Sequence, residues 1–129
     1  MRFPVSLPNE VVAVVFHMIN LMNKITLMNT SILTAFGKFA YMPLSHEDAR
    51  ALVHNSDEVQ SAIGHQATAE ILTELLEIPV LQNRIEYSQQ PEEIALVFKL
   101  RNRAPEGMIL SRDEIEAIGY DFALLRRIK

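Results

Sequence analysis

A Gly-His pair, Gly64-His65, stands at the start of a strongly periodic segment and combines two groups that phosphodiester chemistry uses. Apolar residues recur with helical spacing over residues 69–76, so His65 is predicted at or near the first turn of a helix. The unpaired backbone N–H groups there and the positive end of the helix dipole favour an anion such as phosphate. Gly64 lets the backbone approach a ligand closely. The alternative is that Gly64 only forms a turn and His65 only caps the helix.

A row of cations on one predicted strand is the second candidate for chemistry. Side chains alternate between faces along residues 94–103, which places Lys99, Arg101 and Arg103 on the same face. Such a row could contact successive phosphates, or it could be an ordinary solvated strand face. Glu106 follows on a Pro-Gly loop. It could orient a nucleophile or base, or form a surface salt bridge of little energetic value with Arg103.

The sequence gives little support for metal or thiol chemistry. It contains no cysteine, which excludes disulfides, cysteine-ligated zinc and a thiol nucleophile. His17, His46 and His54 show no metal-ligand spacing with one another or with His65, and no Gly-rich phosphate loop is present. We therefore expect neither a metal nor a cofactor.

Length and composition indicate one globular domain. The chain has 129 residues, 49% of them hydrophobic, and a formal net charge of −4. An acidic protein is a poor candidate for sequence-independent binding to duplex nucleic acid, so a local basic row and a small anion are favoured. We expect a cytoplasmic protein without a membrane segment, because the apolar run at residues 11–16 is too short to cross a bilayer.

The start of the chain has a composition of its own. We expect a single domain over residues 22–129, preceded by an extension of uncertain status at residues 1–21. That segment could instead add a strand or helix to the domain, or serve in export or membrane association. It has too little basic character and no small-x-small cleavage site for a signal peptide.

The remaining elements predict an α/β fold with a mixed sheet of about five strands flanked by helices. One helix is expected to begin at Ser45 and to end before Asn55. A short helical turn is expected at residues 59–63, and the main helix follows it to about Glu77. Another helix is expected from Ser111 to Gly119. Pro43 limits its strand to an edge, and a hairpin is expected through Gln90-Pro91. The predicted strands are residues 24–28, 38–44, 83–88, 94–103 and 120–128.

Several short motifs, in this order and spacing, carry a family resemblance over residues 22–129. They are KITLMNTS (24–31), AIGH (62–65) with Thr68, QNRI (82–85), Arg103 with Glu106-Gly107, and ILS (109–111). With them the chain resembles the viral ring nucleases, type III anti-CRISPR proteins first described as a domain of unknown function in archaeal viruses and later found in phages and bacteria. Residues 1–21 have no counterpart in that pattern.

The resemblance implies a homodimer that binds cyclic tetra-adenylate, the second messenger of type III CRISPR defence, and cuts it into linear di-adenylates without a metal. It implies that the catalytic residues are His65, Arg103 and Glu106. The implied ligand-binding residues are Asn29, Thr30, Ser31, Gly64, Thr68, Arg84 and Lys99. Lys99 departs from some relatives, which carry a neutral amide there. A non-catalytic protein that sequesters the ligand, and a small dimeric regulator whose histidine is only a cap, are the competing hypotheses.

Overall fold

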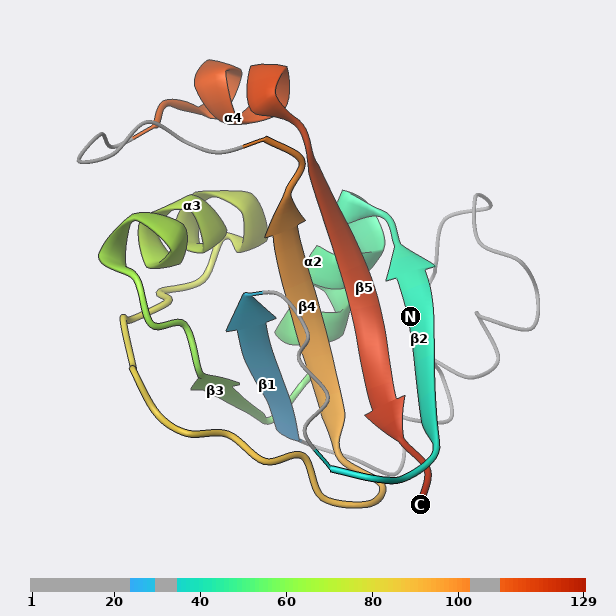
Figure 1. Ribbon diagram of the computed structural model, residues 1–129. Coiled ribbons are helices and arrows are strands. Elements are labelled where there is room, and N and C mark those ends of the chain that lie inside the picture. The colour runs from blue at the N-terminus through green and yellow to red at the C-terminus, as the bar shows by residue number, and fades with distance from the viewer. Residues whose placement is uncertain (1–23, 30–34, 103–109) are drawn as a thin grey trace.

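The computed structural model describes residues 24–29, 35–102 and 110–129. Within these ranges five strands form one mixed sheet in the order β2-β5-β4-β1-β3 (Figure 1). The elements, in chain order, are β1 (Lys24–Asn29), β2 (Phe39–Leu44), α2 (His46–His54), β3 (Glu58–Ser61), α3 (Gln66–Leu76), β4 (Ile94–Leu100), α4 (Arg112–Ile118) and β5 (Tyr120–Arg127). The predicted α/β class with a five-stranded mixed sheet is confirmed.

Three neighbouring strands are parallel. β1 pairs in parallel with both β3 and β4, while β5 runs antiparallel between β4 and β2. The carboxyl ends of β1, β3 and β4 therefore lie together at one end of the sheet, where Asn29, Ser61 and Leu100 end the strands. In α/β proteins ligands bind at the carboxyl ends of the parallel strands.

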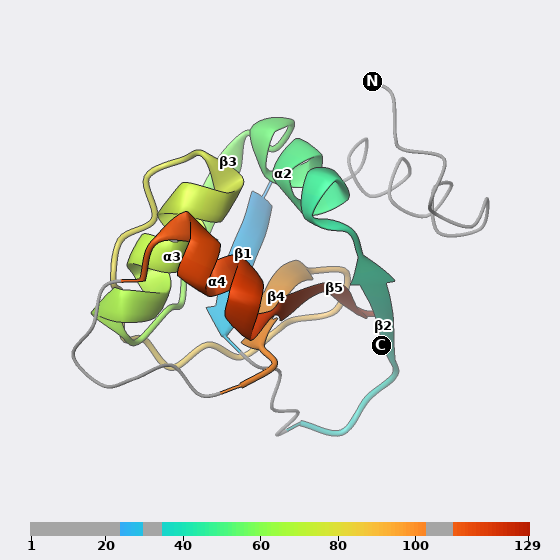
Figure 2. The same cartoon turned by 90° about the horizontal axis from the view of Figure 1, so that it is seen from above.

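The two faces of the sheet are buried by different parts of the chain. α2 and α3 lie on the same side of the sheet (Figure 2) and bury the apolar face that includes Leu27, Leu96 and Phe98. The opposite face is also buried at Ala95, Val97, Ala123 and Leu125. The segment between α3 and β4 passes across that face (Figure 2), where the Gln89 amide donates to the Leu125 carbonyl over 2.9 Å.

Several local predictions are confirmed. Ser45 caps α2, since its hydroxyl accepts from the Asp48 N–H over 3.1 Å. Ser111 and Glu114 form a complete capping box, and α4 ends at Gly119. β2, which contains Pro43, lies at an edge of the sheet as expected for a strand that cannot donate at that position.

Three local predictions are wrong. Residues 59–63 are not a helical turn, because pairing with β1 makes them largely the strand β3. Residues 83–88 are not a strand, and the hairpin through Gln90-Pro91 is absent because β4 has β1 and β5 as its neighbours. β4 ends at Leu100 and not at Arg103, since its last partner is Tyr120, the first residue of β5.

Nothing in the described part of the chain is a helix with both the length and the apolar character needed to cross a membrane. Residues 1–23 lie outside the described ranges, so the division between an extension and a domain stays a prediction, as does the homodimer.

Candidate functional site

His65 is the residue that immediately precedes α3 and acts as its N-cap. Its backbone is extended, with φ −124° and ψ 132°, and its carbonyl accepts from the Ala69 N–H over 3.1 Å. The imidazole makes no capping hydrogen bond, and the residue is exposed. Its predicted position at the first turn is confirmed, whereas the alternative role of the side chain as a cap is not. Among the described residues the ring has no hydrogen-bond partner.

The loop that carries His65 is held firmly between β3 and α3. The Ala62 N–H donates to the Leu27 carbonyl over 2.9 Å, and the Ile63 N–H donates to the Ser61 hydroxyl over 3.2 Å. Ile63 itself is fully buried. These contacts fix the backbone just before the helix, so the backbone from which the exposed imidazole projects has a rigid support.

Arg84 reaches the same loop from the segment that follows α3. Its Nη2 lies 3.4 Å from the Gly64 carbonyl oxygen, which also accepts from Gln82 Nε2 at 2.9 Å. A Cβ built on Gly64 would lie 3.6 Å from Arg84 Nε, an ordinary contact distance. Gly64 does not have a positive φ, so the site does not need a glycine for backbone conformation. Its lack of a side chain leaves room beside Arg84.

Asn29, Thr68 and Lys99 lie at or near the same end of the molecule. Asn29 ends β1 and pairs with Phe98, the residue before Lys99. Thr68 is in the first turn of α3 and is half-buried, whereas Asn29 and Lys99 are exposed. These three predicted ligand-binding residues thus lie on β1, α3 and β4. Strand alternation places Asn29 on the sheet face that α3 covers and Lys99 on the opposite face.

Arg101 differs from the other cations of the predicted row. It follows the end of β4 and forms a two-bond pair with Asp121, with Nη2 2.9 Å from Oδ1 and Nε 3.3 Å from Oδ2. The Arg101 hydrogen bond lowers the pKa of the Asp121 carboxyl, and the same pair raises the pKa of Arg101. Because β4 ends at Leu100, the expectation that Arg101 lies on the strand beside Lys99 is wrong, whereas Arg103 lies outside the described residues.

Four predicted site residues lie outside the described ranges: Thr30, Ser31, Arg103 and Glu106. The described residues contain no group of three or more histidine, cysteine or acidic side chains able to hold a metal ion. Sequence reasoning gave no chemical role to Ser61, Gln82 and Asn83, whose side chains join β3 and its following loop to the segment after α3. The sequence pattern predicts a helical turn at Ser61 and a strand beginning at Asn83, and neither expectation brings these segments together.

Comparison with known proteins identifies the family. The model of the STIV B116-like family matches residues 25–122. The chain is 30% identical to the uncharacterized protein YddF of Bacillus subtilis over 81% of its own length and 98% of that protein. It is 37% identical to the uncharacterized protein ORF117 of Acidianus two-tailed virus, over 71% of this chain and 80% of the viral one.

A solved structure has the same fold. B116 of Sulfolobus turreted icosahedral virus superposes with a TM-score of 0.68 and 24% identity, covering 80% of this chain and 98% of B116. The predicted resemblance to a family of archaeal viruses and bacteria is confirmed. The chain belongs to the STIV B116-like family.

Proposed function

We propose that this member of the STIV B116-like family is a metal-independent ring nuclease. It would cleave cyclic tetra-adenylate into linear di-adenylates with 2′,3′-cyclic phosphate ends and so switch off type III CRISPR signalling. The observation that carries the proposal is the His65 imidazole, exposed and without a hydrogen-bond partner among the described residues, at the N-terminus of α3. A histidine that contributes nothing to capping its helix is available for proton transfer.

The proposed reaction is attack by a ribose 2′-OH on its adjacent phosphate. A bond forms between the 2′-oxygen and phosphorus while the 2′-hydroxyl proton is released to water. The bond to the 5′-oxygen breaks, and the leaving 5′-oxygen takes a proton from His65. The first-turn N–H groups of α3 would hold the phosphate oxygens. This chemistry requires in-line placement of the 2′-OH, which is a positioning task for the surrounding residues.

The other residues would share the tasks of positioning and charge stabilisation. We assign Arg103 to the scissile phosphate and Glu106 to holding either His65 or the 2′-OH, both on the basis of the resemblance. Arg84, beside Gly64, and Lys99, at the end of β4, are cations suited to the remaining phosphates.

The assembly forms part of the same proposal. A ligand with two-fold symmetry suits a two-fold dimer, in which each subunit would supply one His65. Asn29, Thr30, Ser31 and Thr68 would then contact the ring from both subunits.

Binding without cleavage is the second candidate. It is favoured by the lysine at position 99, which departs from some relatives that carry a neutral amide there.

Incubation of the purified protein with labelled cyclic tri-, tetra- and hexa-adenylate in EDTA separates these candidates. We expect the tetra-adenylate to be converted to linear di-adenylate with a cyclic phosphate end. Ligand that is bound but recovered intact after long incubation would establish sequestration. Absence of binding to every ring would overturn both proposals and leave the small dimeric regulator.

A further inference from the structure

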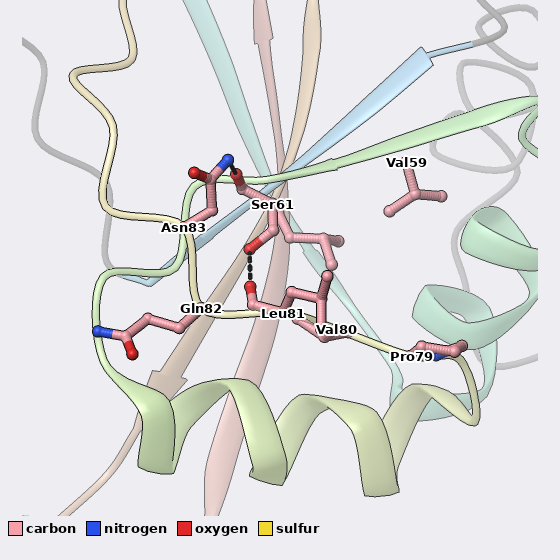
Figure 3. A pocket seen from close by; sticks show the side chains of 8 residues that line it. Val59, Ser61, Pro79, Val80, Leu81, Gln82 and Asn83 are labelled. Atoms are coloured by element: carbon pink, nitrogen blue, oxygen red, sulfur yellow. Dashed lines mark hydrogen bonds between the residues drawn. The ribbon is translucent and has the colours of Figure 1, made fainter.

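Five hydrogen bonds join residues 61–64, which lead to His65, to residues 81–84 of the segment that follows α3. A pocket of about 320 Å³ lies between β3 and the same segment, with Val59 and Pro79 at one end of it (Figure 3). Where this pocket lies, side chains do not fill the space between β3 and the segment. The hydrogen bonds therefore carry much of the connection between the two.

Asn83 makes two of these five bonds, and both end on the edge of β3 and its extension that faces away from β1. Its backbone N–H donates to the Ile63 carbonyl and its Nδ2 donates to the Ser61 carbonyl, both over 2.8 Å (Figure 3 shows the side-chain bond). The Ala62 N–H points the other way, to Leu27 on β1. Alternate residues of a strand direct their backbone groups to opposite edges. Asn83 thus supplies two donors where a neighbouring strand would supply them.

The same bonds hold the backbone from which both His65 and Arg84 project. A peptide group is planar, so a hydrogen bond to its carbonyl oxygen restrains the direction of the whole group. Asn83 holds two such groups just before Gly64, and Arg84 Nη2 lies 3.4 Å from the Gly64 carbonyl oxygen. His65 follows Gly64 and Arg84 follows Asn83 along the chain, so Asn83 restrains the backbone at both places.

We propose that Asn83 is a positioning residue, which fixes the backbone positions from which the His65 imidazole and the Arg84 guanidinium project toward the ligand. It does not itself contact the ligand. Its effect on the reaction rests on the proposed function, whereas its effect on the backbone does not. Aspartate has the shape of asparagine but offers only acceptors when it is ionised, so it cannot replace the Nδ2 donor.

The test compares Asn83→Asp and Asn83→Ala with the wild type in single-turnover cleavage of cyclic tetra-adenylate. Both variants lose Nδ2 and keep the backbone N–H that bonds to Ile63. We expect the rate to fall at least about tenfold in each, because small misplacements of reacting groups slow a reaction strongly. Affinity should change less than about threefold, since Asn83 does not contact the ligand and Arg84 is one of several groups assigned to it.

Asn55→Ala is the matched control. Asn55 is also exposed, and its Nδ2 donates to the Ala51 carbonyl over 2.7 Å at the end of α2. We expect this variant to lower the urea midpoint by an amount similar to Asn83→Ala while its cleavage rate stays within about twofold of the wild type. An equal loss of rate in the two variants would show that general stability is responsible and would overturn the positioning role.

Backbone amide NMR of the protein without ligand gives a readout that does not need cleavage. We expect the amide signals of Gly64 and His65 to broaden or double in Asn83→Asp and to keep their wild-type form in Asn55→Ala. Unchanged signals would overturn the positioning role, even if the wild type cleaves the ring. So would a wild-type cleavage rate in Asn83→Asp. Disturbed signals in Asn83→Asp, together with a wild type that does not cleave, would support the effect on the backbone and remove the nuclease.

Discussion

The two ends of α3 use histidine in opposite ways. At the C-terminal end, His46 Nε2 contacts the Leu75 carbonyl and His54 Nε2 lies 2.8 Å from the Leu76 carbonyl. These carbonyls have no acceptor role within the helix, so the two rings satisfy them. At the N-terminal end, the His65 ring makes no capping bond.

The C-terminal end is bound to several parts of the fold. Arg50 Nη1 donates to Glu77 over 2.7 Å, and the Tyr120 hydroxyl lies 3.3 Å from His46 Nδ1 and donates to Glu116 over 2.9 Å. Both nitrogens of the His46 ring therefore have a partner. The contrast is between a histidine at a helix end whose ring nitrogens are both engaged and one whose ring has no hydrogen-bond partner among the described residues.

Removal of His65 should give the largest functional effect. We expect His65→Ala to lower the single-turnover cleavage rate about 10²-fold or more, the usual scale for loss of a general acid. Binding of cyclic tetra-adenylate and the urea midpoint should change little, since the exposed ring makes no capping hydrogen bond and has no hydrogen-bond partner among the described residues. His65→Asn is the control, because asparagine is a good N-cap but cannot transfer the proton. Cleavage at the wild-type rate by either variant would remove His65 from the mechanism.

Arg103 and Arg101 should differ strongly. Arg103→Ala should reduce the single-turnover rate by about 10- to 10³-fold, because charge grows on the phosphate in the transition state. Arg101→Ala should leave the rate nearly unchanged, since that guanidinium is already paired with Asp121. Similar rate losses in both variants would show that the two arginines serve one structural purpose.

Loss of His46 should affect stability and not chemistry. His46→Ala removes the partner of the Leu75 carbonyl and the stacking on Phe122, whose ring centroid lies 6.0 Å away. We expect the free energy of unfolding to fall by about 1–3 kcal/mol. Urea denaturation measures this change, and cleavage per folded molecule should match the wild type. A larger loss of stability in His65→Ala than in His46→Ala would reverse the contrast between the two ends.

Lys99→Ala should mainly weaken binding. Lys99 is exposed at the end of β4, where its charge is screened by salt. Affinity for cyclic tetra-adenylate, measured by calorimetry, should fall several-fold at low salt and less at high salt. Lys38→Ala, at the exposed residue that precedes β2, is the charge-matched control. The same loss in both variants would mean that only net charge matters.

The smallest expected effect is a pH dependence at α4. The Arg112 and Tyr120 hydrogen bonds lower the pKa of Glu116 below its ordinary value. A carboxyl with a lowered pKa stabilises the fold above its unfolded pKa, and this stabilisation is lost as pH falls through the folded value. Glu116 is half-exposed, so Glu116→Gln should cost less than about 1 kcal/mol at pH 7 and nothing in strong acid. A difference that persists in strong acid would show that packing, not charge, is responsible.

Local signals allowed much of the fold to be predicted. The caps at Ser45 and Ser111 and the edge position of Pro43 depend on residues close in sequence, and these predictions are confirmed. β3 could not be predicted, because residues 58–61 become a strand only through parallel pairing with β1, more than 30 positions earlier. The alternating pattern at residues 83–88 predicted a strand that is absent. That segment contacts β3 through side chains such as Asn83, and a local pattern does not show this contact.

The predictions for the site likewise divide into those that depend on local sequence and those that depend on contacts between distant segments. The position of His65 followed from the helical period and the preceding Gly64. The pair between Arg101 and Asp121 depends on the register of β4 and β5, which no local pattern specifies. The pocket beside Gln82 likewise depends on where the chain returns after α3.

The most direct test of the contrast between the two ends of α3 is imidazole NMR on ¹⁵N-histidine-labelled protein. The titrant is 2′-deoxy cyclic tetra-adenylate, which lacks the attacking hydroxyl and so cannot be cleaved by the proposed reaction. We expect the His65 ring signals to shift on binding while those of His46 and His54 stay in place. Shifts at His46 or His54 with His65 unmoved would contradict the assignment of the ligand to the N-terminal end of α3.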